Sequence, residues 1–420
     1  NGTTVTMISA KSPEEIDYTK YGISNDDPDV VKGRAGSPYA VKDYYNVNPD
    51  LAENPANRLE EFGALIERTH KAGMKVIIDI VPNHVARNYH SITNPEGVED
   101  FGVSDDKTKT YDVNNNFYYN PGEEFQVPEF LNGYQPLGGD KHPLSDRKFT
   151  EVPAKWTGDG SRSSQPHFND WYETVKVNYG VSPDGRKDFN ELPEGFDNKD
   201  YKVHFQFWKD KTVPDSWIKF RDIALYWLDF GVDGFRFDMA EMVPVEFWSF
   251  MNSSIKMKNP EAYILAEVYN PSLYRDYIKK GKMDYLYDKV QLYDTIKHIM
   301  QGRGSTDHIP PIQNYLNDIE KEISSMNSYN GYLYVMGPTG KIYSKQLIES
   351  NNNIYGTFNP ITRTLPFEIR NLSPGTTFSN LTLRYDNTNI WLPPSMLEGT
   401  TSTSNGLIGS TYTNNTILLN

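Results

Sequence analysis

Polar or charged residues stand at the ends of three apolar runs of the sequence, and their types suit acid–base chemistry. These residues are Asp79, Asn83, His84, Arg236, Asp238 and Glu267. Burying such groups costs free energy unless they pair with one another or take part in chemistry. We therefore interpret them as members of one candidate site.

The carboxyl groups of Asp238 and Glu267 are predicted to hold different charges. Arg236 lies two residues before Asp238 and shares its strand face, where a guanidinium keeps a carboxylate ionised. Glu267 follows the apolar run Ala-Tyr-Ile-Leu-Ala, so we expect burial to raise its pKa and keep it protonated near neutrality. One ionised and one protonated carboxyl group form the pair that cleaves a glycosidic bond.

Each short motif also has a purely structural explanation. The pattern D-x-x-x-N-H that starts at Asp79 is more often a turn at the end of a strand than a site. The pattern G-F-R-x-D can form a buried ion pair between Arg236 and Asp238. Together with Glu267, in this order and each at a predicted strand end, the motifs are more specific than any one of them.

Helices and buried strands alternate along the segments that carry these residues. Asn54 and Pro55 suit the start of a helix that Gly73 ends. Further helices are predicted at 216–230, 244–252 and 291–300, and strands at 75–80, 234–238, 262–267 and 283–287. This order predicts an α/β fold with a parallel sheet and right-handed crossovers, whose functional groups collect at the carboxyl ends of the strands.

Two regions depart from this alternation. The stretch between Val85 and Val213 is rich in Gly, Pro, Asn and Asp and is too long for a simple loop, which predicts an inserted subdomain. After residue 323, short runs such as YLYVM, KIYS, FSNLTLRY and NIWL alternate with breaks rich in Gly, Pro, Asn and Ser. This pattern predicts a β-rich C-terminal segment.

Composition excludes several classes of function. The 420 residues carry 42 Lys and Arg against 56 Asp and Glu, a net charge of −14, which argues against nucleic acid as the main partner. The chain has no cysteine and no apolar run long enough for membrane insertion. Aromatic residues make up 13% of the chain, and their rings suit stacking on sugars as well as packing in a large core.

The motifs resemble those of the alpha-amylase superfamily, glycoside hydrolase family 13. The match includes Asp79, Asn83 and His84, then Gly234 to Asp238, and then the run that ends in Glu267. Upstream, 38–44 resembles the family's G-Y-x-x-x-D-Y segment, and 173–178 resembles its short domain B motif. The resemblance implies a TIM-barrel-type (β/α)8 catalytic domain with an inserted domain B. It assigns 1–84 and 216–322 to the barrel and 85–215 to domain B, and leaves 323–420 as the β-rich segment.

The resemblance also implies roles for individual residues. Asp238 would be the nucleophile that forms a covalent glycosyl intermediate, and Glu267 the general acid and then base. Arg236 would hold Asp238 in place, His84 would bind hydroxyls of the sugar, and Tyr39 would stack beneath its ring. Asp79 and Asn83 would support the site. No cofactor is required; the resemblance offers Asn83 as a calcium ligand but defines no metal site.

The sequence departs from the family pattern in three places. None of the eight histidines is followed by Asp, although the family carries a third essential acid in a His-Asp pair. The predicted first strand, 4–9, corresponds to the second barrel strand, and the tail stands where the last strands belong. Glu241 and Met242 replace the Lys and His that often follow the nucleophile. We therefore expect an incomplete barrel, in a chain that is itself incomplete or joined to foreign sequence.

The predicted function is a retaining glycoside hydrolase that acts on alpha-glucosidic bonds of starch-like glucans, with an alpha-glucan as its partner. Two alternatives remain at this stage. One is a catalytically silent glucan-binding protein on the same scaffold, and the other is a related glucosyl transferase. The tail could also be an independent carbohydrate-binding β-module, because Leu372-Ser-Pro-Gly-Thr-Thr resembles a fibronectin type III turn.

Overall fold

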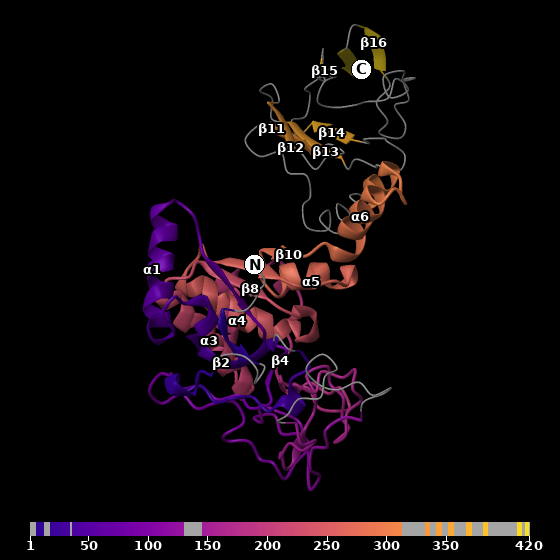
Figure 1. Ribbon diagram of the computed structural model, residues 1–420. Helices are drawn as coiled ribbons and strands as arrows, with labels where there is room; N and C mark the ends of the chain where they lie inside the picture. The colour runs from indigo at the N-terminus through magenta and orange to yellow at the C-terminus, as the bar shows by residue number, and fades with distance from the viewer. Residues whose placement is uncertain are drawn as a thin grey trace. The chain divides into compact units, whose positions relative to one another are not determined.

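The structure is a computed structural model, and it divides into two compact units, residues 1–288 and 289–420 (Figure 1). It describes residues 6–11, 17–33, 36–129 and 145–312, and beyond these only the backbone of seven strands. The two units are described separately. The domain boundaries predicted at 84, 215 and 322 stay predictions.

A parallel sheet of four strands forms the centre of the first unit. Its strands are β3 (Ile77–Ile80), β8 (Gly234–Phe237), β9 (Tyr263–Ala266) and β10 (Tyr285–Leu286), in the order β10-β9-β8-β3. All three pairings are parallel. The four predicted strands are thus confirmed. Their order in the sheet follows their order along the chain.

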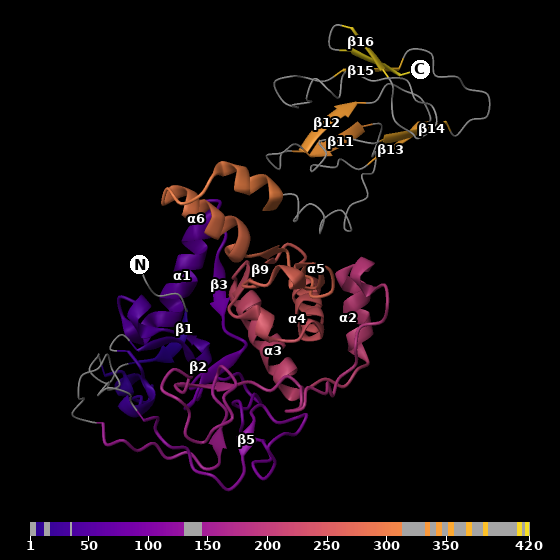
Figure 2. The same cartoon turned by 90° about the vertical axis from the view of Figure 1, so that its right-hand side faces the viewer.

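Helices separate these strands along the chain, as predicted. They are α1 (Arg58–Lys71), α2 (Tyr201–Lys209), α3 (Asp215–Phe230), α4 (Val245–Lys258) and α5 (Tyr274–Lys279). Figure 2 shows α2, α3 and α4 side by side, and α4 contacts both of the others. The side chain of Asn54 caps the turn that leads into α1 by accepting from the Ala56 N–H at 3.1 Å, and Gly231 ends α3 with φ +115°.

The two faces of β8 carry different side chains. Phe235 and Phe237 are fully buried, and the Phe237 ring lies 4.8 Å from that of Trp248 on α4. The opposite face carries Gly234 and Arg236 and continues to Asp238, because side chains alternate along a strand. A Cβ atom at Gly234 would lie 2.1 Å from the main-chain oxygen of Tyr263, so only glycine allows β8 and β9 to approach this closely.

The N-terminal strand does not join the parallel sheet. Strand β1 (Met7–Ala10) pairs antiparallel with β2 (Ser37–Val47), with register shifts along its length. The prediction that 4–9 would form a parallel barrel strand is therefore wrong for the part that is described. The long β2 strand, most of whose residues are buried, supplies the partner that β1 uses instead.

Between β3 and α2, the described residues (81–129 and 145–200) form mostly turns with a few short strands. Strand β4 (His84–Ala86) pairs antiparallel with β7 (Thr174–Lys176), and β5 (Tyr119–Asn120) pairs with β6 (Ala154–Lys155). Side-chain amides hold the turns together: Asn178 donates to the carbonyls of Asp112 and Asn115, both at 2.8 Å.

Short 3-10 helices also occur in the first unit. They are Thr19–Tyr21, Pro28–Val30, Pro49–Leu51, Pro55–Asn57, Phe196–Asn198, Ala240–Met242 and Pro271–Leu273. The segment Ala240–Met242 matters for the site, because it follows Asp238 directly.

The second unit begins with helices and continues with antiparallel strands. A π-helix (Lys289–Tyr293) leads into α6 (Asp294–Met300), which is followed by the short helix Thr306–His308. Strands β11 (Tyr332–Met336) and β12 (Ile342–Gln346) pair, as do β13 (Asn352–Gly356) and β14 (Phe367–Asn371). Strands β15 (Leu381–Arg384) and β16 (Ser410–Thr413) both pair with β17 (Thr416–Leu419).

Two predictions for the tail, the strand at 389–392 and the turn at 372–377, lie outside the described residues. Among the helices that the structure describes, none is both long and apolar enough to cross a membrane.

Candidate active site

The side chain of Arg236 brings three predicted acids together. Its Nη1 atom donates to both carboxylate oxygens of Asp79, at 3.1 and 3.0 Å, and to Oδ1 of Asp238 at 2.6 Å. Its Nη2 atom lies 3.2 Å from Oε2 of Glu267. The residues predicted from three separate strand ends therefore form one connected cluster.

The strand register explains why these residues meet. Asp79 on β3 is the register partner of Arg236 on β8, so the two side chains share one face. The main-chain N–H of Asp238 donates to the carbonyl of Ile80, and that of Glu267 donates to the carbonyl of Phe237, both at 2.9 Å. Parallel pairing thus continues just past the assigned strands and fixes the backbone beneath both acids.

Tyr287, which follows β10, completes the surroundings of Arg236. Its hydroxyl oxygen accepts from the Arg236 Nε at 3.1 Å, and the guanidinium lies 5.3 Å from the centre of its ring. Sequence reasoning did not single out this tyrosine. The available signal was its position at the end of the fourth predicted strand, where site residues are expected.

Glu267 has partners on both carboxylate oxygens. Oε2 accepts from the Met239 N–H at 2.9 Å, in addition to its contact with Arg236, and Oε1 accepts from the Tyr269 hydroxyl. The main-chain N–H groups of Tyr269 and Asn270 both donate to Oε2 of Glu241, each at 2.9 Å. Glu241, noted above as a departure from the family pattern, therefore anchors the loop that carries Tyr269.

The order of the two pKa values is the reverse of the predicted one. Burial raises the pKa of Asp238 to about 6, and the attraction of Arg236 only partly offsets it, so Asp238 is still mostly charged at pH 7, as predicted. Burial also acts to raise the pKa of Glu267, but the hydrogen bonds from Tyr269 and Met239 and the charge of Arg236 bring it below its ordinary value. The expectation of a protonated Glu267 was wrong because those donors could not be read from the apolar run.

The interaction between the carboxyl groups of Asp238 and Glu267 contributes to both pKa shifts. Burial also raises the pKa of Asp79 to about 7, in spite of its contact with Arg236. Three carboxyl groups thus surround one guanidinium, and the cluster favours retaining protons near neutrality because one positive charge does not balance three negative ones.

Tyr39, Asn83 and His84 meet at the start of β4. The His84 imidazole is hydrogen-bonded to the main chain of Tyr39, and its Nδ1 lies 3.0 Å from Nδ2 of Asn83. Burial and then the charge of Lys176 lower the pKa of His84 to about 3, so this side chain is neutral. The His84 ring also packs edge-on against Trp171, with ring centres 5.5 Å apart.

Tyr44, from the segment that resembles G-Y-x-x-x-D-Y, lies between these residues and the acids. Its fully buried hydroxyl donates to the carbonyl of Val81. Burial raises the pKa of Tyr44 well above its ordinary value, and the charges of Asp238 and Asp79 act in the same direction. The contact fixes the chain between β3 and His84.

The surroundings of Asn83 do not fit calcium binding. The Lys176 ammonium donates to the Asn83 carboxamide oxygen, which is the atom that calcium would need. The other end of the amide donates to the Gly158 carbonyl at 2.9 Å. In the part of the chain that the structure describes, no cluster of three or more His, Asp or Glu side chains is suited to a metal ion.

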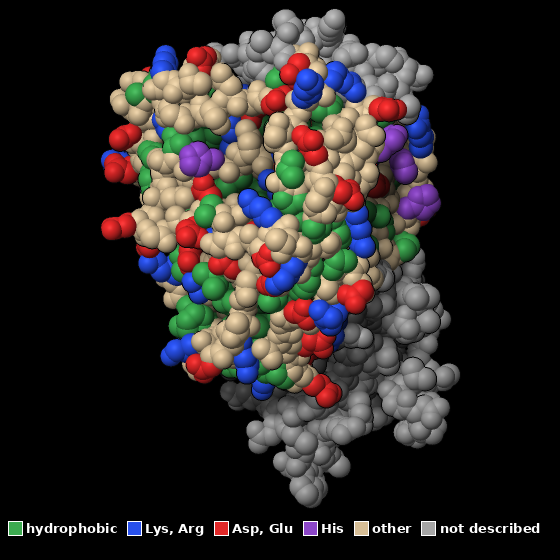
Figure 3. All heavy atoms as spheres, turned by 90° about the horizontal axis from the view of Figure 1, so that it is seen from below, with side chains coloured by type: hydrophobic (Ala, Val, Ile, Leu, Met, Phe, Trp, Pro, Cys, Tyr) green, Lys and Arg blue, Asp and Glu red, His purple; other side chains and the backbone are tan. Residues whose placement is uncertain are grey.

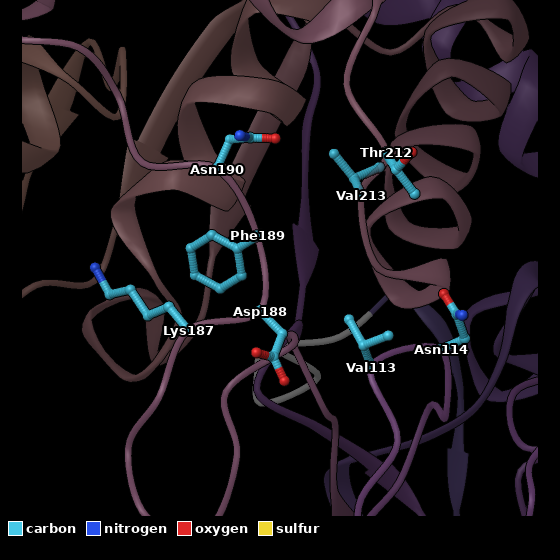
Figure 4. Close-up of a pocket in the computed structure, with 8 residues that line it drawn as sticks. All are labelled: Val113, Asn114, Lys187, Asp188, Phe189, Asn190, Thr212 and Val213. Carbon is cyan, nitrogen blue, oxygen red and sulfur yellow. The ribbon is translucent and has the colours of Figure 1, made fainter.

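A separate hollow of about 440 Å³ lies between the insertion and the segment before α3 (Figure 4). Its lining comprises Val113, Asn114, Lys187, Asp188, Phe189, Asn190, Thr212 and Val213. None of the acids around Arg236 lines it. Acidic and basic side chains are mixed over the face shown in Figure 3.

Parts of the chain are similar to known proteins. Residues 26–130 match the model of the alpha-amylase catalytic domain. The chain is 24% identical over 262 residues to an alpha-amylase from Streptomyces lividans, which covers 60% of this chain and 25% of that protein. It is 32% identical over 102 residues to an alpha-1,4-glucan:maltose-1-phosphate maltosyltransferase from Burkholderia pseudomallei, which covers 24% of this chain and 9% of that protein. Over these stretches the chain is similar to proteins of the alpha-amylase family.

Solved structures give only partial likenesses. An alpha-amylase from Lactobacillus plantarum is 20% identical with a TM-score of 0.36, and covers 75% of this chain and 49% of its own. A cyclic alpha-maltosyl-(1→6)-maltose hydrolase from Arthrobacter globiformis is 15% identical with a TM-score of 0.40, and covers 77% of this chain and 58% of its own. The chain spans a quarter or less of the two curated relatives. The match to the alpha-amylase catalytic domain is consistent with a (β/α)8 barrel, of which the structure shows four parallel strands.

Proposed function

We propose that this chain carries the nucleophile and the acid–base residue of a retaining glycosidase that acts on alpha-glucosidic bonds of starch-like glucans. The single observation that carries the proposal is the contact of one guanidinium, Arg236, with the carboxyl groups of both Asp238 and Glu267. The shared guanidinium supports the short separation of the two carboxyl groups that retention of configuration needs.

In the proposed reaction, the Asp238 carboxylate attacks the anomeric carbon while Glu267 gives its proton to the departing glycosidic oxygen. The bond between sugar and leaving group breaks, and a covalent glycosyl ester forms on Asp238. Water then attacks the anomeric carbon, loses a proton to Glu267 and releases Asp238. Arg236 orients the nucleophile, while His84 binds sugar hydroxyls and Tyr39 stacks beneath the ring.

The first step needs Glu267 in its protonated form, although burial raises the pKa of Asp238 and the hydrogen-bond donors lower that of Glu267. The one proton that the pair takes up must therefore reside on Glu267, and not on Asp238, when the glycosidic bond breaks. Positive charge that develops on the sugar in the transition state favours the charged form of Asp238, so bound substrate favours this position of the proton.

The finer architecture belongs to the same proposal. Residues 85–215 would form domain B, inserted between β3 and the second part of the barrel, and 323–420 a β-rich appendage. The prediction that this chain lacks the third acid of the family stays untested. Asp386, the last Asp of the chain, lies outside the described residues.

The test is sugar release from soluble starch by the purified chain. We expect Asp238→Asn and Glu267→Gln each to lower the release of reducing ends by roughly 10³-fold or more. Asp222→Asn is the matched control, because that carboxylate pairs with Arg221 outside the cluster and its loss should leave the rate unchanged. Glucan binding without any sugar release by the unaltered protein would reject the proposal in favour of a glucan-binding protein.

A transferase is the second candidate, because one relative is named as a maltosyltransferase. The covalent intermediate would then pass to a sugar hydroxyl in place of water. Incubation with starch and a labelled maltose acceptor distinguishes the two. Label in longer oligosaccharides supports transfer, and unlabelled short products support hydrolysis.

A further inference from the structure

Both carboxylate oxygens of Glu267, the acid–base residue of the proposed reaction, have hydrogen-bond partners in this structure. Glu267 receives the Tyr269 hydroxyl on Oε1 and the Met239 N–H, at 2.9 Å, on Oε2. Arg236 adds an ionic contact of 3.2 Å to Oε2. General acid catalysis requires a carboxyl oxygen within hydrogen-bond reach of the leaving group.

These partners differ in how readily they can move. The Met239 N–H is part of the backbone turn that precedes Ala240–Met242, and the carbonyl of Ala240 accepts from the Trp248 indole at 3.0 Å. Arg236 is held by Asp79, Asp238 and Tyr287 as well. The Tyr269 side chain is partly exposed, and a single rotation about its own side-chain bonds would withdraw the hydroxyl.

The backbone of Tyr269 is anchored independently of its hydroxyl. Glu241 accepts from the N–H groups of Tyr269 and Asn270, both at 2.9 Å, so the loop remains in place when the side chain turns. The ring of Tyr269 lies 6.5 Å from that of Tyr287, on the side of the cluster where Arg236 is held.

We propose that Tyr269 is a positioning residue that holds Oε1 of Glu267 in the substrate-free site, and that the leaving-group oxygen of a bound glycan displaces its hydroxyl. This inference rests on the proposed function and adds a step to it. In the free site the tyrosine keeps Glu267 in its charged, inactive form. In the complex the substrate oxygen takes the place of the tyrosine, and Glu267 can receive the proton that the pair takes up.

The direction of the effect follows from the groups that face Glu267. Burial acts to raise the pKa of Glu267, and the charge of Asp79 lies nearby. The Tyr269 hydroxyl, the Met239 N–H and Arg236 stabilise the charged form of Glu267, and the interaction with the Asp238 carboxyl acts in the same direction. Tyr287 faces Arg236 from β10, and Glu241 contacts only the backbone of the loop. Removing the tyrosine hydroxyl takes away one donor to the carboxylate, so the pKa of Glu267 must rise.

The experiment is a carbon-13 NMR titration of the full chain with labelled glutamate carboxyls, in which Glu267→Gln assigns the signal. We expect Tyr269→Phe to raise the midpoint for Glu267 by about one pH unit or more, since hydrogen bonds to charged groups contribute this much. Saturating maltotriose should produce a shift in the same direction in the unaltered protein. The alkaline limb of starch hydrolysis should move upward in Tyr269→Phe, because hydrolysis needs protonated Glu267.

Tyr111→Phe is the matched control. It removes a tyrosine hydroxyl that donates to a carboxylate, Asp188, at 2.9 Å, outside the cluster around Arg236. The Glu267 midpoint should not change in this variant.

An unchanged midpoint for Glu267 in Tyr269→Phe would overturn the positioning role, and bound maltotriose that leaves the midpoint unchanged would overturn the displacement. The titration does not depend on turnover. Two results together would reject the proposed function but keep the positioning role of Tyr269. These are a shifted Glu267 midpoint in Tyr269→Phe and no sugar release by the unaltered protein.

Discussion

At the scale of single residues, the cluster around Arg236 concentrates negative charge beyond what its guanidinium balances. The consequence is clearest for Asp79, whose carboxyl is mostly buried and whose pKa is raised to about 7. Its charged form is therefore less stable in the folded protein than in the unfolded chain. This is a cost to stability that follows from gathering acids at one site.

Asp79→Asn should show this cost as a dependence of stability on pH. The folded protein binds the extra proton between about pH 4 and 7, so the unaltered protein loses stability as pH rises through that range. The Asp79→Asn variant, whose amide does not titrate, does not lose stability in this way. We expect the melting temperature of Asp79→Asn, relative to the unaltered protein, to increase from pH 4 to 7 and to stay level above pH 8.

Asp233→Asn is the control, in which the stability should change with pH in the opposite direction. Although burial acts to raise it, the pKa of Asp233 is lowered by hydrogen bonds from the Val76 N–H and His70. The charged form of Asp233 therefore stabilises the fold, and the amide variant should lose stability relative to the unaltered protein as pH rises through about 4. The same pH trend in both variants would contradict the assignment for Asp79.

The site residues that could be predicted are those marked by a short sequence motif. Asp79, Arg236, Asp238 and Glu267 come from motifs at strand ends, and strand register alone brings them together. Tyr269, Tyr287 and Lys176 were not singled out because each acts through a contact made by the tertiary fold. The protonation of Glu267 was predicted wrongly for the same reason: the deciding donors to its carboxylate are a loop tyrosine and one main-chain N–H.

At the scale of the elements, apolar runs and helix caps predicted the helices and strands around the parallel sheet closely. Asn54 caps the turn into α1 and Gly231 ends α3, as local sequence rules require. The insertion was harder to predict, because its strands are two or three residues long and its turns depend on Asn and Asp side chains. The antiparallel pairing of β1 depends on a partner thirty residues away.

Gly234→Ala tests the close approach of β8 and β9. The added Cβ would lie 2.1 Å from the Tyr263 main-chain oxygen, so the strands must separate and the sheet beneath the acids must shift. We expect a large loss of melting temperature or failure to fold. Gly73→Ala is the comparison: its φ is +73° with nothing within 4 Å of the new Cβ, so it should cost only about 1 kcal/mol. Equal losses would contradict the role of Gly234.

At the scale of the whole first unit, a buried lysine links the insertion to the end of β3. Lys176 on β7 donates to the Asn83 side chain, and the paired strands β4 and β7 continue that contact. Burial lowers the pKa of Lys176 to about 8, which shows how completely the ammonium is removed from water. Two segments almost a hundred residues apart are joined by one charge-assisted hydrogen bond.

Lys176→Met should lower the melting temperature, because it leaves the Asn83 oxygen without its donor, at a cost of about 1–3 kcal/mol. Lys187→Met is the control, since its ion pair with Glu246 involves a partly exposed ammonium and its loss should matter less. A chelator should leave the melting temperature of the unaltered protein unchanged. A drop that added calcium reverses would show that a metal ion stabilises the fold after all.

The placement of the long insertion has a consequence for how such a chain can vary. All of the insertion enters between β3 and β8, yet the hydrogen bonds from Asp233 to Val76 and from Asp238 to Ile80 join those strands directly at both ends. Loops in this stretch can therefore lengthen, shorten or change their composition while the spacing of the acids stays constant. Under the proposed function, recognition of different sugars can diversify there without any change to the groups that break the bond.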